Sequence, residues 1–112
     1  MTDDLGKDLN TALTNVVPLF YAEAETETYP FCVYTRVIRE NRTKDGVVSI
    51  FSELTLDVVS DTYEVAKEKA ASVRTAVESL GTDYIIAFQA CEPSCTEGIW
   101  VFEIDYNIRQ IA

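Results

Sequence analysis

Carboxylates are the most abundant groups in this chain that could take part in acid–base chemistry. Asp57, Glu103 and Asp105 lie in segments that alternate apolar and polar residues, so pairs of them can share one face of a sheet. Two carboxylates can act as general acid and general base when a concave site shifts their pKa values. The sequence specifies no such site, and the pattern favours solvated surface charge.

Nucleophilic and metal chemistry lack their usual partners. The sequence contains no histidine, so its serine, threonine and cysteine side chains have no imidazole base. It also has no glycine-rich phosphate loop, and a structural zinc site would need four ligands where only three cysteines are present. We therefore expect no catalytic residue, no cofactor and no metal ion, and we expect that the protein is not an enzyme.

The three cysteines point to a reducing compartment. Their number is odd, and the acidic start of the chain lacks the basic and apolar stretches of a secretory signal, which favours an intracellular protein with free thiols. Cys32 lies in an apolar segment and is expected in the core. Cys91 and Cys95 flank an apparent turn around Pro93, where oxidation could join them. Reduced, incidental thiols are the favoured interpretation.

Composition predicts one soluble domain spanning residues 1–112. Hydrophobic residues make up 47% and charged residues 25%, and no apolar run approaches the ~20 residues of a membrane helix, so no membrane contact is expected. Nineteen acidic residues oppose nine basic ones, for a net charge of -10. Such a chain repels a phosphate backbone, which disfavours sequence-specific nucleic-acid binding.

The basic residues are not spread evenly. Four of them fall between positions 36 and 44, at the end of one expected strand and in the turn that follows it. Two interpretations stay open: a solvated hairpin tip, or a contact with another subunit or a partner protein. The candidate contact residues are Arg36, Arg39, Arg42, Lys44 and Asp45.

The N-terminal half predicts a helix and a long hairpin. Leu5, Leu9 and Leu13 recur at helical spacing, and Pro18 closes that pattern. Residues 22–28 alternate small residues with glutamate and read as a solvated linker or a weak edge segment. Strands are then expected over 30–38 and 48–60, joined by turn residues at 41–46.

The C-terminal half predicts a helix followed by two further strands. Asp61 is expected to be the N-cap, with Glu64 three positions later completing a reciprocal capping pair, and Gly81 ends the helix. Strands follow over 84–91 and from Ile99, where apolar and polar residues alternate strictly.

These elements predict an α+β fold in the order α-β-β-α-β-β. We expect a two-layer sandwich in which two helices pack on one face of a mostly antiparallel, four-stranded sheet. Trp100, Phe102 and Tyr106 would face the helices as core, since base stacking would require that face to be open. The opposite face would carry polar groups such as Glu103 and Arg109.

The arrangement resembles a known family. After the leading helix, the segments that carry the resemblance are Tyr29-Pro30-Phe31-Cys32-Val33-Tyr34, Leu54-Thr55-Leu56-Asp57-Val58-Val59-Ser60, Asp61-Thr62-Tyr63-Glu64-Val65-Ala66 and Phe102-Glu103-Ile104-Asp105-Tyr106-Asn107-Ile108. Together they are similar to the small tail-completion proteins of long-tailed phages, the lambda-type tail terminators. The similarity spans nearly the whole chain and consists of apolar patterns and a helix start.

The resemblance implies a structural role in a phage or prophage. Subunits would join as a ring, commonly a hexamer, that completes the tail tube and presents a surface for head–tail joining. The implied partners are other copies of the chain, the tail tube protein and head–tail connector proteins, first in the host cytoplasm and then in the virion tail. The alternative is a non-catalytic cellular adaptor or small-ligand-binding module with the same layered fold.

Overall fold

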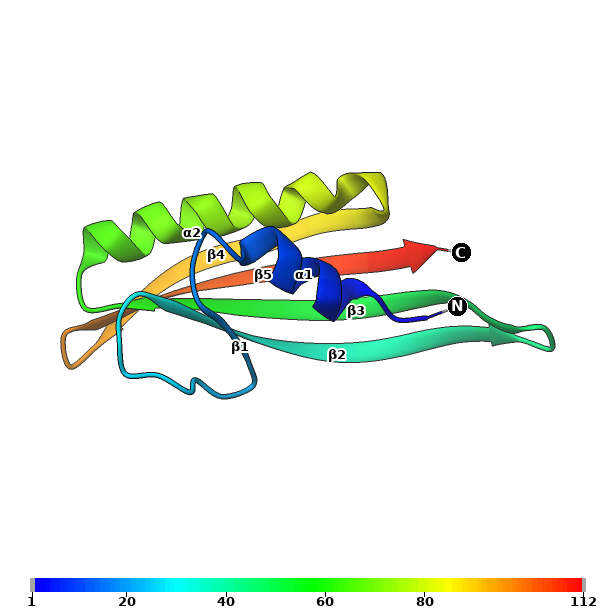
Figure 1. Cartoon of the computed structure of the whole chain (residues 1–112), viewed down its shortest axis with the longest axis horizontal. Helices are drawn as coiled ribbons and strands as arrows, with labels where there is room; N and C mark the ends of the chain where they lie inside the picture. The colour runs from blue at the N-terminus through cyan, green and yellow to red at the C-terminus, as the bar shows by residue number, and fades with distance from the viewer. Residues whose placement is uncertain (1, 112) are drawn as a thin grey trace.

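A sheet and two helices form two layers in the computed structural model, which describes residues 2–111 (Figure 1). Both helices lie on the same face of the sheet. In chain order the elements are α1 (Leu5–Leu13), β1 (Leu19–Tyr21), β2 (Phe31–Thr43), β3 (Gly46–Ser60), α2 (Tyr63–Glu78), a 3₁₀ turn (Ser79–Thr82), β4 (Tyr84–Thr96) and β5 (Ile99–Ile111).

The sheet has five strands in the order β1-β2-β3-β5-β4, so the predicted four-stranded sheet is wrong in one detail. The additional strand is β1, which pairs in parallel with the start of β2, Leu19 opposite Cys32. It is only three residues long, too short to show an alternating pattern. The exposed segment 22–30 carries the chain round to β2 without regular structure, which identifies it as a linker.

Apolar alternation on the two central strands builds the core as expected. Leu54, Leu56 and Val58 of β3 stand opposite Tyr106, Ile104 and Phe102 of β5, and all six are buried beneath the helices. Burying each such side chain contributes about 1.5–3 kcal/mol of transfer free energy. The helices close this face with one apolar stripe each: Leu5, Leu9 and Leu13 from α1, and Ala66, Ala70, Val73 and Val77 from α2.

Both hairpins have shorter turns and longer strands than predicted. The residues between β2 and β3 reduce to Lys44 and Asp45, because Thr43 already pairs with Gly46. β4 likewise continues to Thr96, and the turn consists of Glu97 and Gly98, both with positive φ. Two-residue turns of that conformation match the twist of paired strands, which allows pairing to extend to the tip.

The longer β4 overturns the proposed turn around Pro93. Cys91 and Cys95 lie in the same strand and pair with Ile104 and Trp100. Four strand residues span roughly 13 Å, whereas a disulfide requires Cα atoms about 4.4–6.8 Å apart. The two thiols are free and cannot bridge within this strand. Cys32 is buried in the core as predicted, and burial raises its pKa to about 12.

The start of α2 is capped one residue later than predicted. Thr62 has extended backbone angles and its hydroxyl accepts a hydrogen bond from the Val65 N–H at 3.4 Å. Asp61 precedes that position, and its carboxylate accepts instead from the Ser60 hydroxyl. The predicted pairing of Asp61 with Glu64 is therefore wrong, because neighbouring residues can both supply cap-type side chains.

Replacing the cap separates the two assignments. We expect Thr62→Ala to lower the free energy of unfolding by about 1 kcal/mol, since the Val65 N–H loses its partner. Asp61→Ala should lower it by less than half as much, because only a weak hydroxyl contact and a surface charge near the helix start are lost. Urea unfolding of both variants measures this, and a larger loss from Asp61→Ala would contradict the assignment of the cap to Thr62.

Candidate assembly surfaces

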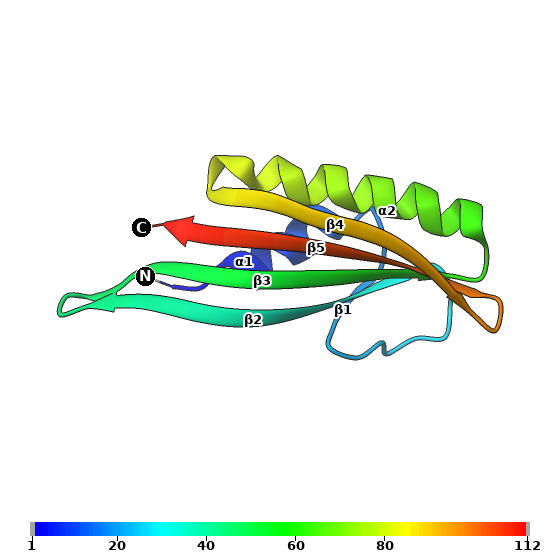
Figure 2. The ribbon, with the colours of Figure 1, turned by 180° about the vertical axis from the view of Figure 1, so that it is seen from behind.

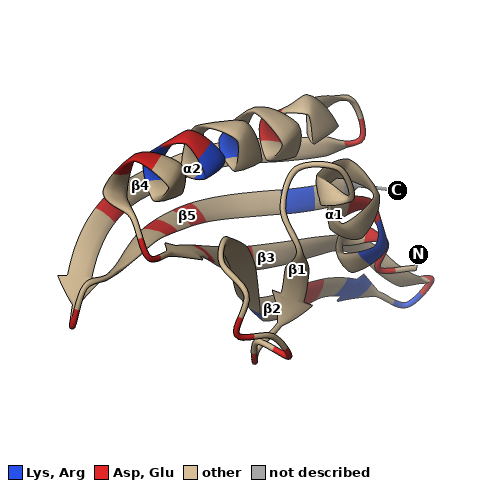
Figure 3. Ribbon diagram, turned by 60° about the vertical axis from the view of Figure 1, so that its left-hand side comes forward, with Lys and Arg blue, Asp and Glu red and all other residues tan. Residues whose placement is uncertain are grey.

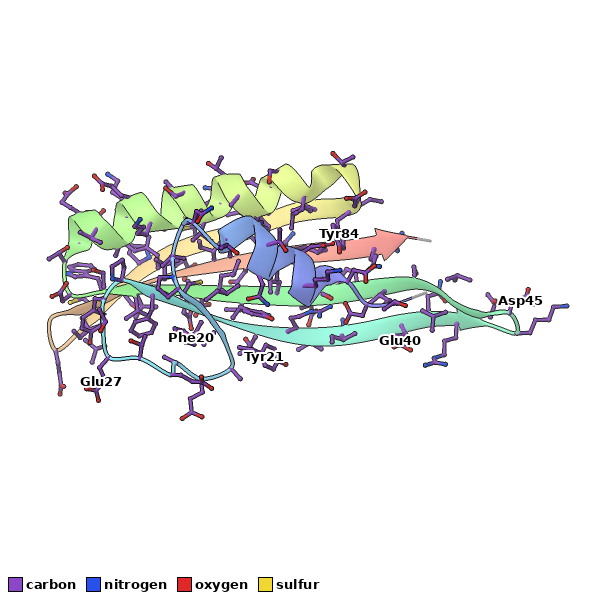
Figure 4. The ribbon with its side chains drawn as sticks, viewed as in Figure 1. Phe20, Tyr21, Glu27, Glu40, Asp45 and Tyr84 are labelled. Atoms are coloured by element: carbon purple, nitrogen blue, oxygen red, sulfur yellow. The ribbon has the colours of Figure 1, made fainter. Side chains whose placement is uncertain are left out.

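The hairpin of β2 and β3 extends beyond the rest of the molecule (Figures 1 and 2). Ser49 pairs with Ile111, the last residue of β5, so residues 42–48 form a two-stranded ribbon without a third strand or a helix beneath it. We call residues 42–48 the arm. It makes the molecule elongated, with extents of 52 × 23 × 23 Å. Asp45 lies at its tip (Figure 4).

Few side chains of the arm and its base are buried. Val37 and Ile38, at the base, are 52% and 46% exposed, and Val48 is also exposed. A two-stranded ribbon by itself is at best marginally stable in water, and exposed apolar side chains on it are typical of a surface that another protein covers. The arm is therefore a candidate contact surface.

The predicted contact residues divide into two groups. Arg36 is used inside the subunit: its side chain is 7% exposed, and its guanidinium contacts the Asp3 carboxylate at 3.0 Å and donates to the Ser52 hydroxyl at 2.7 Å. It ties the N-terminal segment to the sheet. The other four residues are exposed and lie on the arm or at its base: Arg39, Arg42, Lys44 and Asp45.

The two exposed arginines have only surface partners. Arg39 contacts Glu53 across the hairpin at 3.1 Å, and Arg42 contacts Glu40 of its own strand at 2.6 Å. Exposed pairs of this kind contribute ~0–1 kcal/mol, so both arginines can exchange these partners for a partner on another molecule at little cost.

The face of the sheet opposite the helices carries a row of carboxylates. Glu103 of β5 lies between Asp57 of β3 and Glu92 of β4, directly opposite each. Asp105 lies next along β5, and its carboxylate accepts a hydrogen bond from Thr55 at 2.9 Å. We call Asp57, Glu92, Glu103 and Asp105 the acidic row. Sequence analysis grouped three of them, but Glu92 was missed because it was assigned to a turn.

The acidic row has no cationic partner among residues 2–111 of the subunit. Of the ion pairs within residues 2–111, none involves its members. One oxygen of Asp57 is buried without a hydrogen-bond partner. Like charges directly opposite each other on neighbouring strands destabilise a sheet. The subunit thus retains an unfavourable arrangement of charge on an otherwise open face.

The pKa values in the acidic row reflect this repulsion. The negative charge of Asp105 raises the pKa of Glu103 above its usual range. Burial, Asp57 and Glu92 add smaller effects in the same direction. Partial burial is the main cause of the raised pKa of Asp57, and Asp105 adds to it. The carboxylates therefore influence one another's pKa, but they lie on an uncovered sheet surface, so they lack the concave site that acid–base catalysis would need.

The open face is polarised along the strands. Arg39 and Arg109 flank Phe51 in one row near the arm, and the acidic row crosses the same strands farther from the arm. Figure 3 shows the basic residues of β2 near the arm and acidic residues on β3, β4 and β5. One molecule therefore presents the acidic row and, nearer the arm, a separate patch in which basic residues predominate slightly: Arg39, Arg42, Lys44 and Arg109 lie among Glu40, Asp45 and Glu53.

A second acidic site lies beside α1. Asp4, Asp8 and Asp83 line a recess of about 300 Å³ together with Tyr84 and Gln110. The Tyr84 hydroxyl donates to Asp8 at 2.5 Å, and burial followed by Asp8 raises the Tyr84 pKa. Sequence reasoning missed this recess, since it joins residues from both ends of the chain.

Two kinds of feature are absent from the described residues. In residues 2–111 no group of three or more histidine, cysteine, aspartate or glutamate side chains is arranged to hold a metal ion. No helix in that range is both long and apolar enough to cross a membrane.

Comparison with solved structures finds a similar fold. The fold is similar to a chain of a solved structure described as "Virion of native gene transfer agent (GTA) particle", with a TM-score of 0.64 and 14% sequence identity. The alignment covers 93% of this chain and 84% of the other. No protein-family model matches the sequence, and no curated protein matches it. The similarity establishes a shared fold over nearly the full length.

Removing one carboxylate should relieve the repulsion. Because folded Glu103 holds its proton more tightly than the unfolded chain does, its contribution to stability falls as pH rises from the ordinary glutamate pKa through the raised one. We expect Glu103→Gln in dilute protein to increase the free energy of unfolding at pH 7 by a few tenths of a kcal/mol. The gain should vanish below pH ~4, where the carboxyl is protonated in both states.

The control for this measurement is Glu25→Gln, an exposed glutamate of the linker. Urea unfolding of both variants at pH 7 and pH 3.5 separates a local effect from a general effect of net charge. The acidic row would not be a source of repulsion if Glu103→Gln lowered the free energy of unfolding at pH 7, or if Glu25→Gln raised it by the same amount.

Proposed function

We propose that this chain is a structural protein of a phage-like virion, whose subunits form a closed ring that completes the tail tube. The observation that supports it best is the fold shared with a chain of the gene transfer agent virion along 93% of this sequence. The resemblance of the sequence to tail terminators supports the same role. A hexamer is the ring size that this resemblance implies.

The surfaces of the subunit suit an assembly protein. Its exposed features are a protruding ribbon and a charged, open sheet face. A closed ring needs two different patches on each subunit that meet around an axis, and the arm and the acidic row are two such patches. The proposed partners are other copies of the chain, the tail tube protein and head–tail connector proteins, in the host cytoplasm during assembly and in the virion tail afterwards.

The adaptor or ligand-binding alternative has less support. An apolar pocket between helix and sheet would favour it, but the gap there, lined by Leu5, Ile50 and Ile108 among others, has no space for a water molecule. The larger recess is lined chiefly by carboxylates. Neither offers the mostly apolar cavity that small-molecule sites generally have.

Two measurements test the proposal. Light scattering over a wide concentration range should show an oligomer of fixed subunit number, and negative-stain images should show closed rings. Added to polymerising tail tube protein from the same genome, the chain should cap the tubes and shorten their length distribution. Tubes of unchanged length without a ring at their ends would contradict the proposed function.

A further inference from the structure

We propose that the arm of one subunit lies across the acidic row of the next copy of the same chain, and that this contact is the repeating interface of the assembly. The inference rests on the proposed ring and names its interface. It follows from four observations: the uncompensated row, the exposed arm, the distance between them, and the small cost of freeing the arm's cations.

The acidic row needs a cation that its own subunit does not supply. Three carboxylates stand side by side across β3, β5 and β4, and Asp105 adjoins them. The raised pKa values of Asp57 and Glu103 reflect the resulting repulsion and partial burial. A partner that places positive side chains on this face converts repulsion into attraction, and burial by that partner strengthens the attraction.

The arm and its base supply exposed cations that match this need, with Asp45 at the tip as the arm's one carboxylate. Arg42 and Lys44 are exposed, and Arg39 lies at the base on the same side as the row. The neighbouring Val37 and Val48 are exposed apolar side chains. On the receiving side, Val33, Val59 and Val101 border the acidic row and are half-buried. Covering both sets adds hydrophobic burial to the charge attraction.

An arm cannot reach the acidic row of its own subunit. Asp105 is the member of the acidic row nearest the arm: it lies level with Thr35 of β2, seven positions along the strand from Arg42. At about 3.3 Å per strand residue the two patches are roughly 23 Å apart on one rigid sheet. The contact must therefore join two molecules. Because the patches differ, the same contact can repeat from subunit to subunit, and it closes into a ring if the rotation allows.

Charge reversal tests each side of the interface separately. Arg42→Glu with Lys44→Glu should make the arm repel the row, and Glu92→Lys with Glu103→Lys should cancel the formal charge of the row and so remove its attraction for the arm. We expect each double variant to raise the subunit dissociation constant by at least ~10-fold in sedimentation velocity at low salt. Neither change touches the core, and the second removes repulsion around Asp57 and Asp105. Unfolding curves verify that both variants are folded.

Mixing the two variants gives the sharper test. In the mixture the acidic arm of one variant meets the two new lysines in the row of the other, and the native arm of the second meets the native row of the first. Assembly should therefore return with the two variants in equal numbers. Matched controls carry the same charge changes elsewhere: Lys7→Glu with Lys67→Glu, and Glu25→Lys with Glu68→Lys, all at exposed positions. The controls should assemble as the unmodified chain does.

The outcomes separate this inference from the proposed function. Rings that persist in both reversal variants would overturn the interface and leave the ring role standing. The interface would also be overturned if the unmodified chain assembled no further than dimers or stayed monomeric at every concentration. Two further results would overturn it: assembly that stays lost when the variants are mixed, and assembly that is lost equally in the controls. Restored assembly on mixing, without any effect on tail tubes, would support the interface and contradict the tail role.

Discussion

The one-sided burial of the sheet is the constraint on which the rest of the structure depends. Alternating apolar side chains on β3 and β5 place Leu54, Leu56 and Ile104 on a single face, and both helices pack there. Neither helix covers the other face, so its residues can be charged at a lower burial cost than on the core face. The acidic row exists because the core occupies the opposite side of the same strands.

The same constraint explains the arm. Helices α1 and α2 cover the sheet only as far as β4 and β5 extend, and β3 pairs with β5 no farther than Ser49. Beyond that point neither face of the ribbon can be buried, and the chain places charged and turn residues there. Arg36, nearest the body, is buried against Asp3 and Ser52, whereas Arg42 and Lys44 are exposed. One run of basic residues therefore serves both stability and surface charge.

Strongly periodic elements could be predicted from the sequence, and short or locally ambiguous ones could not. The alternation from Trp100 to Ile108 indicates a strand with one wet face, and α2 follows from its apolar spacing. β1 could not be found because it is three residues long and is held by its pairing with β2. The cap moved from Asp61 to Thr62 because both residue types can cap, and only the backbone angles distinguish them.

The candidate surfaces were predictable in composition and unpredictable in arrangement. The basic cluster is visible in the sequence, but the buried position of Arg36 depends on Asp3, 33 residues away. The acidic row depends on which residues of three strands stand opposite one another. Glu92 joined it only because β4 continues through Pro93, which a strand at the sheet edge tolerates since its outward N–H needs no partner.

The most direct test of the central claim is zero-length carbodiimide cross-linking of a mixture of ¹⁴N- and ¹⁵N-labelled chains, followed by mass spectrometry. This reagent joins a lysine amine to a carboxylate only when they are in contact. The account predicts cross-links from Lys44 to Glu92 or Glu103 in peptide pairs of mixed isotope composition, which must come from two molecules. The account would be contradicted if Lys44 formed cross-links between copies only to carboxylates outside the acidic row. The absence of cross-linked peptides of mixed isotope composition in assembled protein would also contradict it.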